Sequence, residues 1–311
     1  MTPSERTRVR VRVPAKVNVQ LAVGAARPDG FHDLANVFLA VGLYDEITVT
    51  PADTLRITCE GPDAGQVPLD ATNLAARAAL ALARRHGIDP RVHVHIAKDI
   101  PVAGGMAGGS ADGAGALLAC DALWSLNSSQ GELLAICAEL GSDVPFSLIG
   151  GAALGTGRGE QLTPLDTDGA FPWVFAVADG GLSTPTVFRE FDRLTAHAPV
   201  PPPAADPALL DALRTGDATA LAATLSNDLQ PAALSLRPSL ADTLTAGRAA
   251  GALAALVSGS GPTTAFLAKS PEAADEVAEA LLASGTCRTA RVATSPAEGA
   301  TVVEHTGQGR N

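Results

Sequence analysis

The amino-acid sequence predicts an α+β protein in which two α/β sandwich domains are separated by a cleft. Its 311 residues are 46% hydrophobic, which is enough for two ordinary domains with buried cores. Residues 8–13 and 91–97 alternate apolar and polar side chains, as half-buried strands do. Beyond residue 170, strand and helix patterns follow in the order β-α-β-β-α-β, which predicts a second sandwich.

Strand and helix patterns also alternate through the first half of the chain. Three valines place one face of the strand 8–13 in the core, and Pro14 is expected to interrupt that strand. Lys16, Asn18 and Gln20 then share one face of the chain, and we expect Gln20 to point to solvent. Further elements are a turn at 28–30, a strand at 44–51, a helix that ends at 87, a helix through 116–126 and a helix from 129 to 141.

The composition changes near residues 166–169, where we expect one domain to end. This places an N-terminal domain at 1–166, a C-terminal domain at 167–300 and a flexible tail at 301–311. A proline-rich linker or lid is predicted at 197–207. The C-terminal domain is expected to hold helices within 207–216, 217–229 and 271–284, and strands within 173–180, 255–268 and 288–295.

Charge and composition exclude several classes of protein. The formal net charge is −11 and the sequence pI is about 4.9, which argues against nucleic acid or an anionic membrane as a partner. The first residues lack the apolar core of a signal peptide, and the longest apolar stretches are too short to cross a bilayer. Four scattered cysteines without metal spacing predict free thiols in a reducing, cytoplasmic setting. Nothing in the sequence excludes a homo-oligomer.

A glycine-rich stretch, "PVAGGMAGGSADG" at 101–113, is the strongest local signal of a binding site. Five glycines directly before a helix pattern favour a loop whose bare backbone holds phosphate at a helix N-terminus. The alternative is a plain surface turn. A Walker A loop would need lysine where Ser110 stands, the dinucleotide-binding glycine pattern fails, and the HRD and DFG motifs of protein kinases are absent.

A second alternative concerns His93 and His95, which share one face of the strand 91–97 and could be two metal ligands. No third ligand is evident nearby, and a solvated strand face explains the pair as well.

Three stretches in order along the chain resemble the GHMP kinases, which phosphorylate small molecules such as galactose, homoserine and mevalonate. They are "PAKVNVQL" at 14–21, the glycine-rich stretch and "SGSGPT" at 258–263. The resemblance implies a ribosomal S5 domain 2-like N-terminal domain, a ferredoxin-like C-terminal domain, ATP as phosphate donor and Mg²⁺. It implies that ATP contacts Pro101, Val102, Ala103, Gly104, Gly105, Met106, Ala107, Gly108, Gly109, Ser110 and Ala111, with Asn73 and Lys98 bordering the adenine.

Three further stretches, "RPDGFHDL", "LGSDVPF" and "LSTPTVF", resemble the branch of the family that acts in the non-mevalonate isoprenoid pathway. That branch phosphorylates a cytidine diphosphate-linked methylerythritol to its 2-phosphate. Alanines at 103, 107 and 111 and phenylalanine at 31 depart from the usual pattern of the branch. The alanines matter only where the backbone needs a positive φ. Other kinases of the family, or a non-catalytic nucleotide-binding protein of the same fold, remain the rival interpretations.

The same resemblance implies a role for each remaining site residue. Asp143 would be the catalytic base and Lys16 its electrostatic partner. The residues alone would favour an N-cap for Asp143 and a solvated side chain for Lys16. The substrate would contact Asn18, Phe31, His32, Thr184 and Phe188, with the two phenylalanines on the two faces of cytosine and His32 at its edge.

Overall fold

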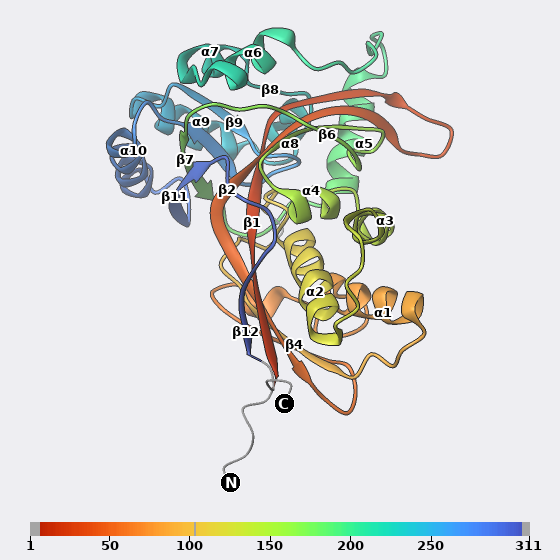
Figure 1. Cartoon of the computed structure of the whole chain (residues 1–311). Coiled ribbons are helices and arrows are strands. Elements are labelled where there is room, and N and C mark those ends of the chain that lie inside the picture. The colour runs from red at the N-terminus through yellow and green to blue at the C-terminus, as the bar shows by residue number, and fades with distance from the viewer. Residues whose placement is uncertain (1–6, 103, 307–311) are drawn as a thin grey trace.

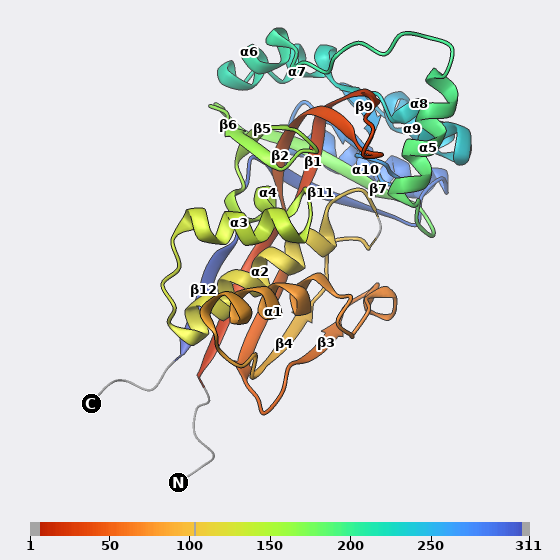
Figure 2. The same cartoon turned by 90° about the vertical axis from the view of Figure 1, so that its right-hand side faces the viewer.

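Two β-sheets organise the chain in the computed structural model, which describes residues 7–102 and 104–306 (Figures 1 and 2). The larger sheet has the strand order β12-β1-β2-β4-β3, with β5 and β6 joined through β2 and β8 joined to β1. Its strands are β1 (Arg8–Ala26), β2 (His32–Pro51), β3 (Arg56–Glu60), β4 (Val92–Ala97), β5 (Ala152–Thr156), β6 (Gln161–Pro164), β8 (Ser226–Asn227) and β12 (Thr301–Thr306).

The antiparallel pair β1–β2 forms the long spine of the molecule, running from the chain ends into the upper half (Figure 1). The valines at positions 9, 11 and 13 are fully buried, as the alternating pattern predicts. Pro14 does not interrupt β1, because a shift of register between Pro14 and Ala15 absorbs it and pairing with β2 continues to Ala26. The chain therefore carries Lys16 and Asn18 on the same strand as the N-terminal core.

Four helices accompany the larger sheet: α1 (Leu74–His86), α2 (Gly108–Trp124), α3 (Gln130–Leu140) and α4 (Val144–Ile149). The first begins at Asn73, whose side chain accepts from the Ala75 N–H, and ends at Gly87 in the left-handed conformation. The third is capped by the Ser129 side chain. The second packs against β1 and β2, and α1 packs against α2 (Figure 2). Helix α3 packs on the other three helices. The helix boundaries predicted at 87 and 129 are thus confirmed.

The smaller sheet confirms the predicted β-α-β-β-α-β order. It consists of β7 (Phe171–Val177), β9 (Ala254–Val257), β10 (Thr264–Leu267) and β11 (Thr289–Ser295), in the spatial order β11-β7-β10-β9 with every neighbouring pair antiparallel. This is the ferredoxin-like arrangement. The helices of this half are α5 (Thr184–Thr195), α6 (Pro207–Thr215), α7 (Ala218–Thr224), α8 (Gln230–Leu236), α9 (Ser239–Ala249) and α10 (Pro271–Ser284).

Two expectations about the chain are corrected by the structure. Residues 301–306, expected in a flexible tail, form β12 and pair antiparallel with β1. Gln20, expected to face solvent, is 6% exposed. Its side-chain amide donates to the Ala204 carbonyl and accepts from the Asp206 N–H, so it tethers the proline-rich segment before α6 to β1. Both errors arise because the partner lies far away in the sequence. β12 pairs with β1, which stands near the other end of the chain, and the two partners of Gln20 lie 184 and 186 residues away.

We propose that the two domains divide at residues 166/167, between β6 and β7, with β12 returning to the N-terminal sheet. Two arginines of the C-terminal half join the two halves. Arg288 donates to both carboxylate oxygens of Asp63 (2.8 and 2.9 Å), and Arg291 does the same to Asp99 (2.8 and 2.6 Å). These paired contacts fix β11 against the larger domain.

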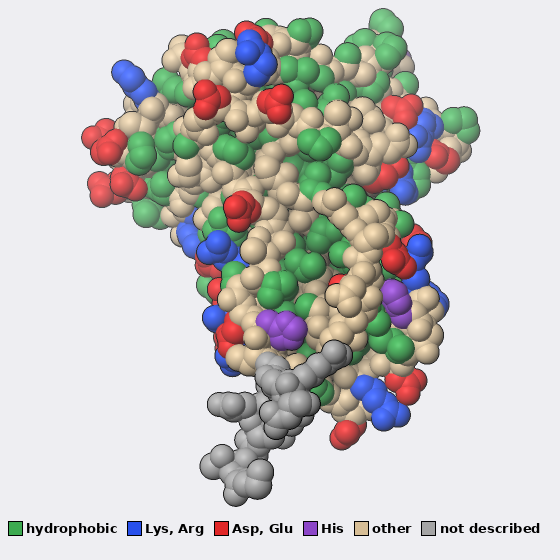
Figure 3. All heavy atoms as spheres, viewed as in Figure 1, with side chains coloured by type: hydrophobic (Ala, Val, Ile, Leu, Met, Phe, Trp, Pro, Cys, Tyr) green, Lys and Arg blue, Asp and Glu red, His purple; other side chains and the backbone are tan. Residues whose placement is uncertain are grey.

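The surface and the helices agree with the composition. Acidic and basic side chains are interspersed over the face in Figure 3 rather than gathered into a basic patch. Across residues 7–102 and 104–306, every helix is too short or too polar to span a membrane.

Candidate active site

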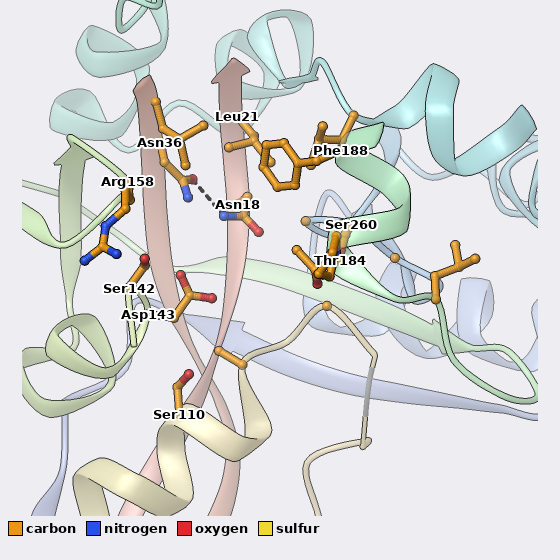
Figure 4. A pocket seen from close by; sticks show the side chains of 18 of the residues that line it. Asn18, Leu21, Asn36, Ser110, Ser142, Asp143, Arg158, Thr184, Phe188 and Ser260 are labelled. Atoms are coloured by element: carbon orange, nitrogen blue, oxygen red, sulfur yellow. Dashed lines mark hydrogen bonds between the residues drawn. The ribbon is translucent and has the colours of Figure 1, made fainter. Parts of the chain in front are cut away.

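A cavity of about 700 Å³ opens where the two domains meet (Figure 4). Its walls come from β1, β2, the glycine-rich loop, the first turn of α2, the turn before α4, the turn between β5 and β6, the start of α5 and the loop 259–261. Most motifs that the sequence singled out therefore converge on one space, although they are spread over more than 240 residues.

The glycine-rich loop forms the floor of this cavity. Its lining members are Gly104, Gly105, Ala107, Gly108, Gly109 and Ser110. The last three form the first turn of α2, where N–H groups have no partner inside the helix and the helix dipole is positive. Pro101, Met106 and Ala111 are buried behind this surface. Val102 lines a separate cavity of about 160 Å³, and Ala103 lies outside the described residues.

Ala107 stands in the left-handed conformation, with φ = +60°, immediately before α2. An L-residue pays about 1–2 kcal/mol there relative to glycine. Alanine at position 107, where the branch usually has glycine, therefore strains the backbone. Ala111, which also departs from the usual pattern, is buried inside α2 and carries no such strain.

The segment 258–263 holds the glycine-rich loop from the side of the C-terminal domain. The Ser258 hydroxyl donates to the Gly105 carbonyl (3.1 Å), and the Thr263 N–H donates to the Gly104 carbonyl (3.2 Å). Gly105 has φ = +78°, and a Cβ built on it would stand 2.1 Å from the Ser258 carbonyl oxygen. The two loops thus touch backbone to backbone, which explains why both are rich in glycine.

Lys16 and Asp143 meet beside this loop. The Lys16 ammonium lies 3.7 Å from Asp143 Oδ2 and donates to Asn18 Oδ1 (2.6 Å) and to the Gly105 carbonyl (2.8 Å). Burial lowers the pKa of Lys16, while the negative charge of Asp143 acts in the opposite direction. Asp143 occupies the N-cap position of α4, but its side chain makes no capping hydrogen bond and is 32% exposed. Its carboxylate is therefore free to face the cavity, between Ser110 and Asn18 (Figure 4).

Asn18 extends the polar contacts to β2. Its amide nitrogen donates to Asn36 Oδ1 (2.7 Å), and its oxygen accepts from Lys16. Both asparagines are buried and line the cavity beside each other (Figure 4). A continuous chain of hydrogen bonds therefore fixes the position of the Lys16 ammonium.

Aromatic side chains gather at the other end of the cavity. Phe31 is 50% exposed, and the Arg158 guanidinium carbon lies 5.1 Å from the centre of its ring. The His32 ring packs on Phe188, with ring centres 5.0 Å apart. Phe188 lies in α5. Thr184 begins the same helix, and its hydroxyl pairs with that of Ser260 (2.9 Å; Figure 4).

Asn73 and Lys98 do not line this cavity themselves, although each adjoins a residue that does: Asn73 precedes Leu74, and a Cβ on Gly108 would stand 2.8 Å from the Lys98 ammonium. Asn73 caps α1 and also donates to the Pro68 carbonyl, so its side chain is occupied inside the fold. Lys98 is buried and donates to Asp45 and to Asp112, the latter at 2.9 Å. Burial raises the pKa of Asp112 to about 7, with Lys98 opposing and Asp45 reinforcing the rise. Contact of either residue with adenine stays a prediction.

Several lining residues escaped the sequence analysis: Asn36, Ser142, Arg158, Arg189, Asp192, Gly259, Ser260 and Gly261. The last three stand in the "SGSGPT" stretch that pointed to the family, so their motif was a usable signal. Ser142 stands in "LGSDVPF", which was also a usable signal. The remaining four are single polar residues within strand, turn or helix patterns, and no spacing distinguishes them from surface residues.

The alternative of a metal pair at His93 and His95 gains no support. Both rings are hydrogen-bonded to the Thr58 hydroxyl on the neighbouring strand β3. Within the described part of the chain, no three His, Cys, Asp or Glu side chains are grouped to hold a metal ion. The four cysteines are free thiols.

Comparison with known proteins gives the same family over most of the chain. The N-terminal domain of GHMP kinases matches residues 73–151, and the C-terminal domain matches 209–286. Proteins named 4-diphosphocytidyl-2-C-methyl-D-erythritol kinase are 79% identical in Streptomyces avermitilis (295 residues, 95% of this chain and 99% of the relative) and 60% identical in Thermobifida fusca (305 residues, 96% and 99%).

Solved structures agree. A crystal structure of 4-(cytidine 5'-diphospho)-2C-methyl-D-erythritol kinase is 33% identical and superposes with a TM-score of 0.76 over 92% of this chain and 99% of that one. Homoserine kinase from Cytophaga hutchinsonii shares the fold alone, at 20% identity and a TM-score of 0.70 over 97% and 99% of the two chains. The chain belongs to the GHMP kinases, in the group of the 4-diphosphocytidyl-2-C-methyl-D-erythritol kinases.

Proposed function

We propose that this protein transfers the γ-phosphoryl group of ATP to the 2-hydroxyl of 4-diphosphocytidyl-2-C-methyl-D-erythritol. The observation that carries the proposal is the meeting of Lys16 and Asp143, 3.7 Å apart, between a phosphate-binding floor and an aromatic end of one cavity. The names of its close relatives support the choice of substrate.

The floor of the cavity suits the polyphosphate of ATP. Free N–H groups of Gly108, Gly109 and Ser110 at the start of α2 would bind phosphate oxygens, with the helix dipole adding positive potential. Because phosphoryl transfer depends mainly on positioning and on charge stabilisation, a rigid loop of this kind supplies much of what the reaction needs. The contacts from Ser258 and Thr263 supply that rigidity.

The substrate hydroxyl needs a proton acceptor as it attacks phosphorus. We assign this role to Asp143, and the assignment is supported by a carboxylate that lines the cavity and makes no cap bond. Lys16 stabilises the negative charge that develops on the attacking oxygen. Its two strong hydrogen bonds, to Asn18 and to Gly105, hold the ammonium beside the carboxylate.

The donor set of the cavity fits Mg²⁺ that arrives with the nucleotide. Mg²⁺ keeps several waters and takes few protein ligands beside phosphate oxygens, and the described residues offer no cluster of three or more metal-ligating side chains. Ser110, whose hydroxyl lies at the cavity floor, would be a ligand. Bound Mg²⁺ would neutralise charge on the phosphate oxygens.

The aromatic end suits a base. Phe31 and Phe188 line the same cavity, and stacking on an aromatic ring is worth about 1–3 kcal/mol for any base. Hydrogen bonds must therefore select cytosine, and we assign this role to His32, which lines the cavity with its ring centre 5.0 Å from that of Phe188. Arg158 and Arg189 add positive charge at the cavity wall, which suits the diphosphate of the substrate.

A panel of alcohols tests the proposal: 4-diphosphocytidyl-2-C-methyl-D-erythritol, homoserine, mevalonate and galactose, each with ATP and Mg²⁺. ADP release and the phosphorylated product are measured together. We expect turnover with the first alcohol alone. Preference for another alcohol would assign the chain to a different reaction of the family, and ATP binding without turnover would point to a non-catalytic role.

Asp143→Asn is the test variant and Asp166→Asn is its control. The first removes the proton acceptor while keeping the shape of the side chain, and we expect turnover to fall about 10²–10⁴-fold with ATP binding retained by calorimetry. Asp166 is an exposed acid outside the cavity, so its variant should keep full turnover. Wild-type kcat in Asp143→Asn would remove Asp143 from the role of base.

A further inference from the structure

Asp192 is an acidic residue of α5 that no motif singled out, and it lies at the cavity wall beside His32. The distance from His32 Nε2 to Asp192 Oδ1 is 2.8 Å. The His32 ring is also enclosed by two aromatic rings of the same helix, with ring centres 5.0 Å from Phe188 and 5.9 Å from Phe191. Three residues of α5 therefore determine how this imidazole is oriented.

The contact with Asp192 determines which ring nitrogen carries the proton. An ionised carboxylate can only accept a hydrogen bond, so Nε2 must be the protonated nitrogen. In neutral imidazole the other nitrogen is then an acceptor. His32 is 6% exposed, and within residues 7–102 and 104–306 no side chain or backbone group bonds to Nδ1. An acceptor without a protein partner thus belongs to a residue that lines the cavity.

We propose that Asp192 selects cytidine over uridine by holding His32 as a hydrogen-bond acceptor. This rests on the proposed function and names the determinant of its base specificity. Cytosine carries an exocyclic amino group, a donor, where uracil carries a carbonyl, an acceptor. His32 Nδ1 pairs with the first and opposes the second. Asp192 is a positioning residue, since it acts through His32.

Among the described residues, the polar contacts of Arg27 and Arg189, two other charged residues near this end of the cavity, do not involve the His32 ring. Arg27 pairs with Asp29 and Asp33 at the tip of the β1–β2 hairpin. Arg189 donates to the Thr186 hydroxyl on its own helix. Among the described acidic groups, Asp192 is the one that contacts the His32 ring.

The test compares kcat/KM for the cytidine substrate and its uridine analogue in the full-length enzyme. We expect the wild type to prefer cytidine, and Asp192→Asn to reduce that preference roughly tenfold, because an amide can donate to Nε2 and move the ring proton to Nδ1. The change should appear mainly in KM, since the base lies away from the reacting hydroxyl. Asp192→Glu, which restores a carboxylate, should recover part of the preference.

The control is Glu190→Gln, an acid on the same helix that pairs with Arg193 and Ser235 rather than with the cavity. It should keep the wild-type preference. A purely structural role of Asp192 would lower kcat/KM for both substrates by the same factor and leave their ratio unchanged, which would overturn the inference while leaving the proposed kinase activity intact. A wild-type enzyme that phosphorylates neither substrate would overturn the proposed function itself.

A spectroscopic readout separates tautomer from packing. The ¹⁵N shifts of His32, assigned through the His32→Gln variant, should show a protonated Nε2 and an unprotonated Nδ1 in the wild type. Asp192→Asn should change this pattern. A protonated Nδ1 in the wild type would contradict the assignment of His32 as an acceptor.

Discussion

Alanine substitution at two glycines of the same loop gives the sharpest test of how the cavity floor is built. Gly105 has φ = +78°, and a Cβ there would lie 2.1 Å from the Ser258 carbonyl oxygen. Gly109 lies in the first turn of α2, and its Cβ would meet nothing closer than Leu74 Cδ1 at 3.8 Å. Both residues line the cavity, but only the first has no room for a methyl group.

The magnitudes follow from this geometry. Gly105→Ala forces an L-residue into the left-handed region, at about 1–2 kcal/mol, and pushes two backbone segments apart, at about 1–3 kcal/mol. We expect a loss of roughly 2–5 kcal/mol in the free energy of unfolding. Turnover should fall as well, because the Gly105 carbonyl accepts from the Lys16 ammonium at 2.8 Å. Gly109→Ala should leave stability unchanged or raise it by up to about 1 kcal/mol, as alanine favours a helix.

Urea unfolding followed by circular dichroism measures both variants against the wild type, and ATP turnover is measured at saturating alcohol. Equal urea midpoints for Gly105→Ala and the wild type would refute the close contact between the two loops. A folded Gly105→Ala protein with full turnover would refute the role of this carbonyl in placing Lys16.

Three further predictions concern stability. Ala107→Gly should raise the free energy of unfolding by about 0.5–1 kcal/mol in urea titrations, because relief of left-handed strain exceeds the entropy that glycine adds to the unfolded chain; a loss would contradict the strain. The pKa of Asp112 is raised to about 7, so the folded chain keeps a proton that the unfolded chain releases near pH 4. The free energy of unfolding of the wild type should therefore fall between pH 4 and 7 relative to that of Asp112→Asn. Parallel pH profiles of the two urea midpoints would exclude the raised pKa. The hydrogen bonds from Arg288 lower the pKa of Asp63, so this carboxylate stabilises the fold above about pH 4. In urea titrations at pH 7, Asp63→Asn should lower the free energy of unfolding by on the order of 1 kcal/mol. This loss should shrink as the pH falls below about 4, and an unchanged loss at pH 3 would count against the ion pair.

Local patterns predicted most of the fold because local forces decide most of it. The alternating valines before Pro14 identified a buried strand, and Gly87 ended α1 where its freedom at positive φ was needed. The spacing of strand and helix patterns after residue 170 predicted the β-α-β-β-α-β order of the C-terminal domain, which the structure shows. The errors arose where a distant partner decides the outcome. Gln20 is buried by a segment near residue 205, and β12 is ordered by pairing with β1.

The candidate site was predictable only where its residues stand in motifs. Glycine-rich stretches have an unusual composition, so the loop and the segment 258–263 could be found directly. For Asp143, sequence surroundings alone favoured a helix cap, and the free side chain became visible only in three dimensions. Asn36 and Asp192 act through single contacts with Asn18 and His32, and a single polar residue in a strand or helix has no sequence signature.

The pairing of β12 with β1 has a consequence for how the chain is made. Residues 8–12 pair on one side with β2 and on the other with residues 301–306, which are synthesised nearly 300 residues later. Until then, that edge of β1 is an open row of N–H and C=O groups, and such edges pair readily with other chains. A fragment truncated at residue 300 keeps this edge open and is exposed to aggregation during expression. The same pairing brings Arg8 opposite Thr306, so a short linker can join the two ends in a circular permutant that retains the complete sheet.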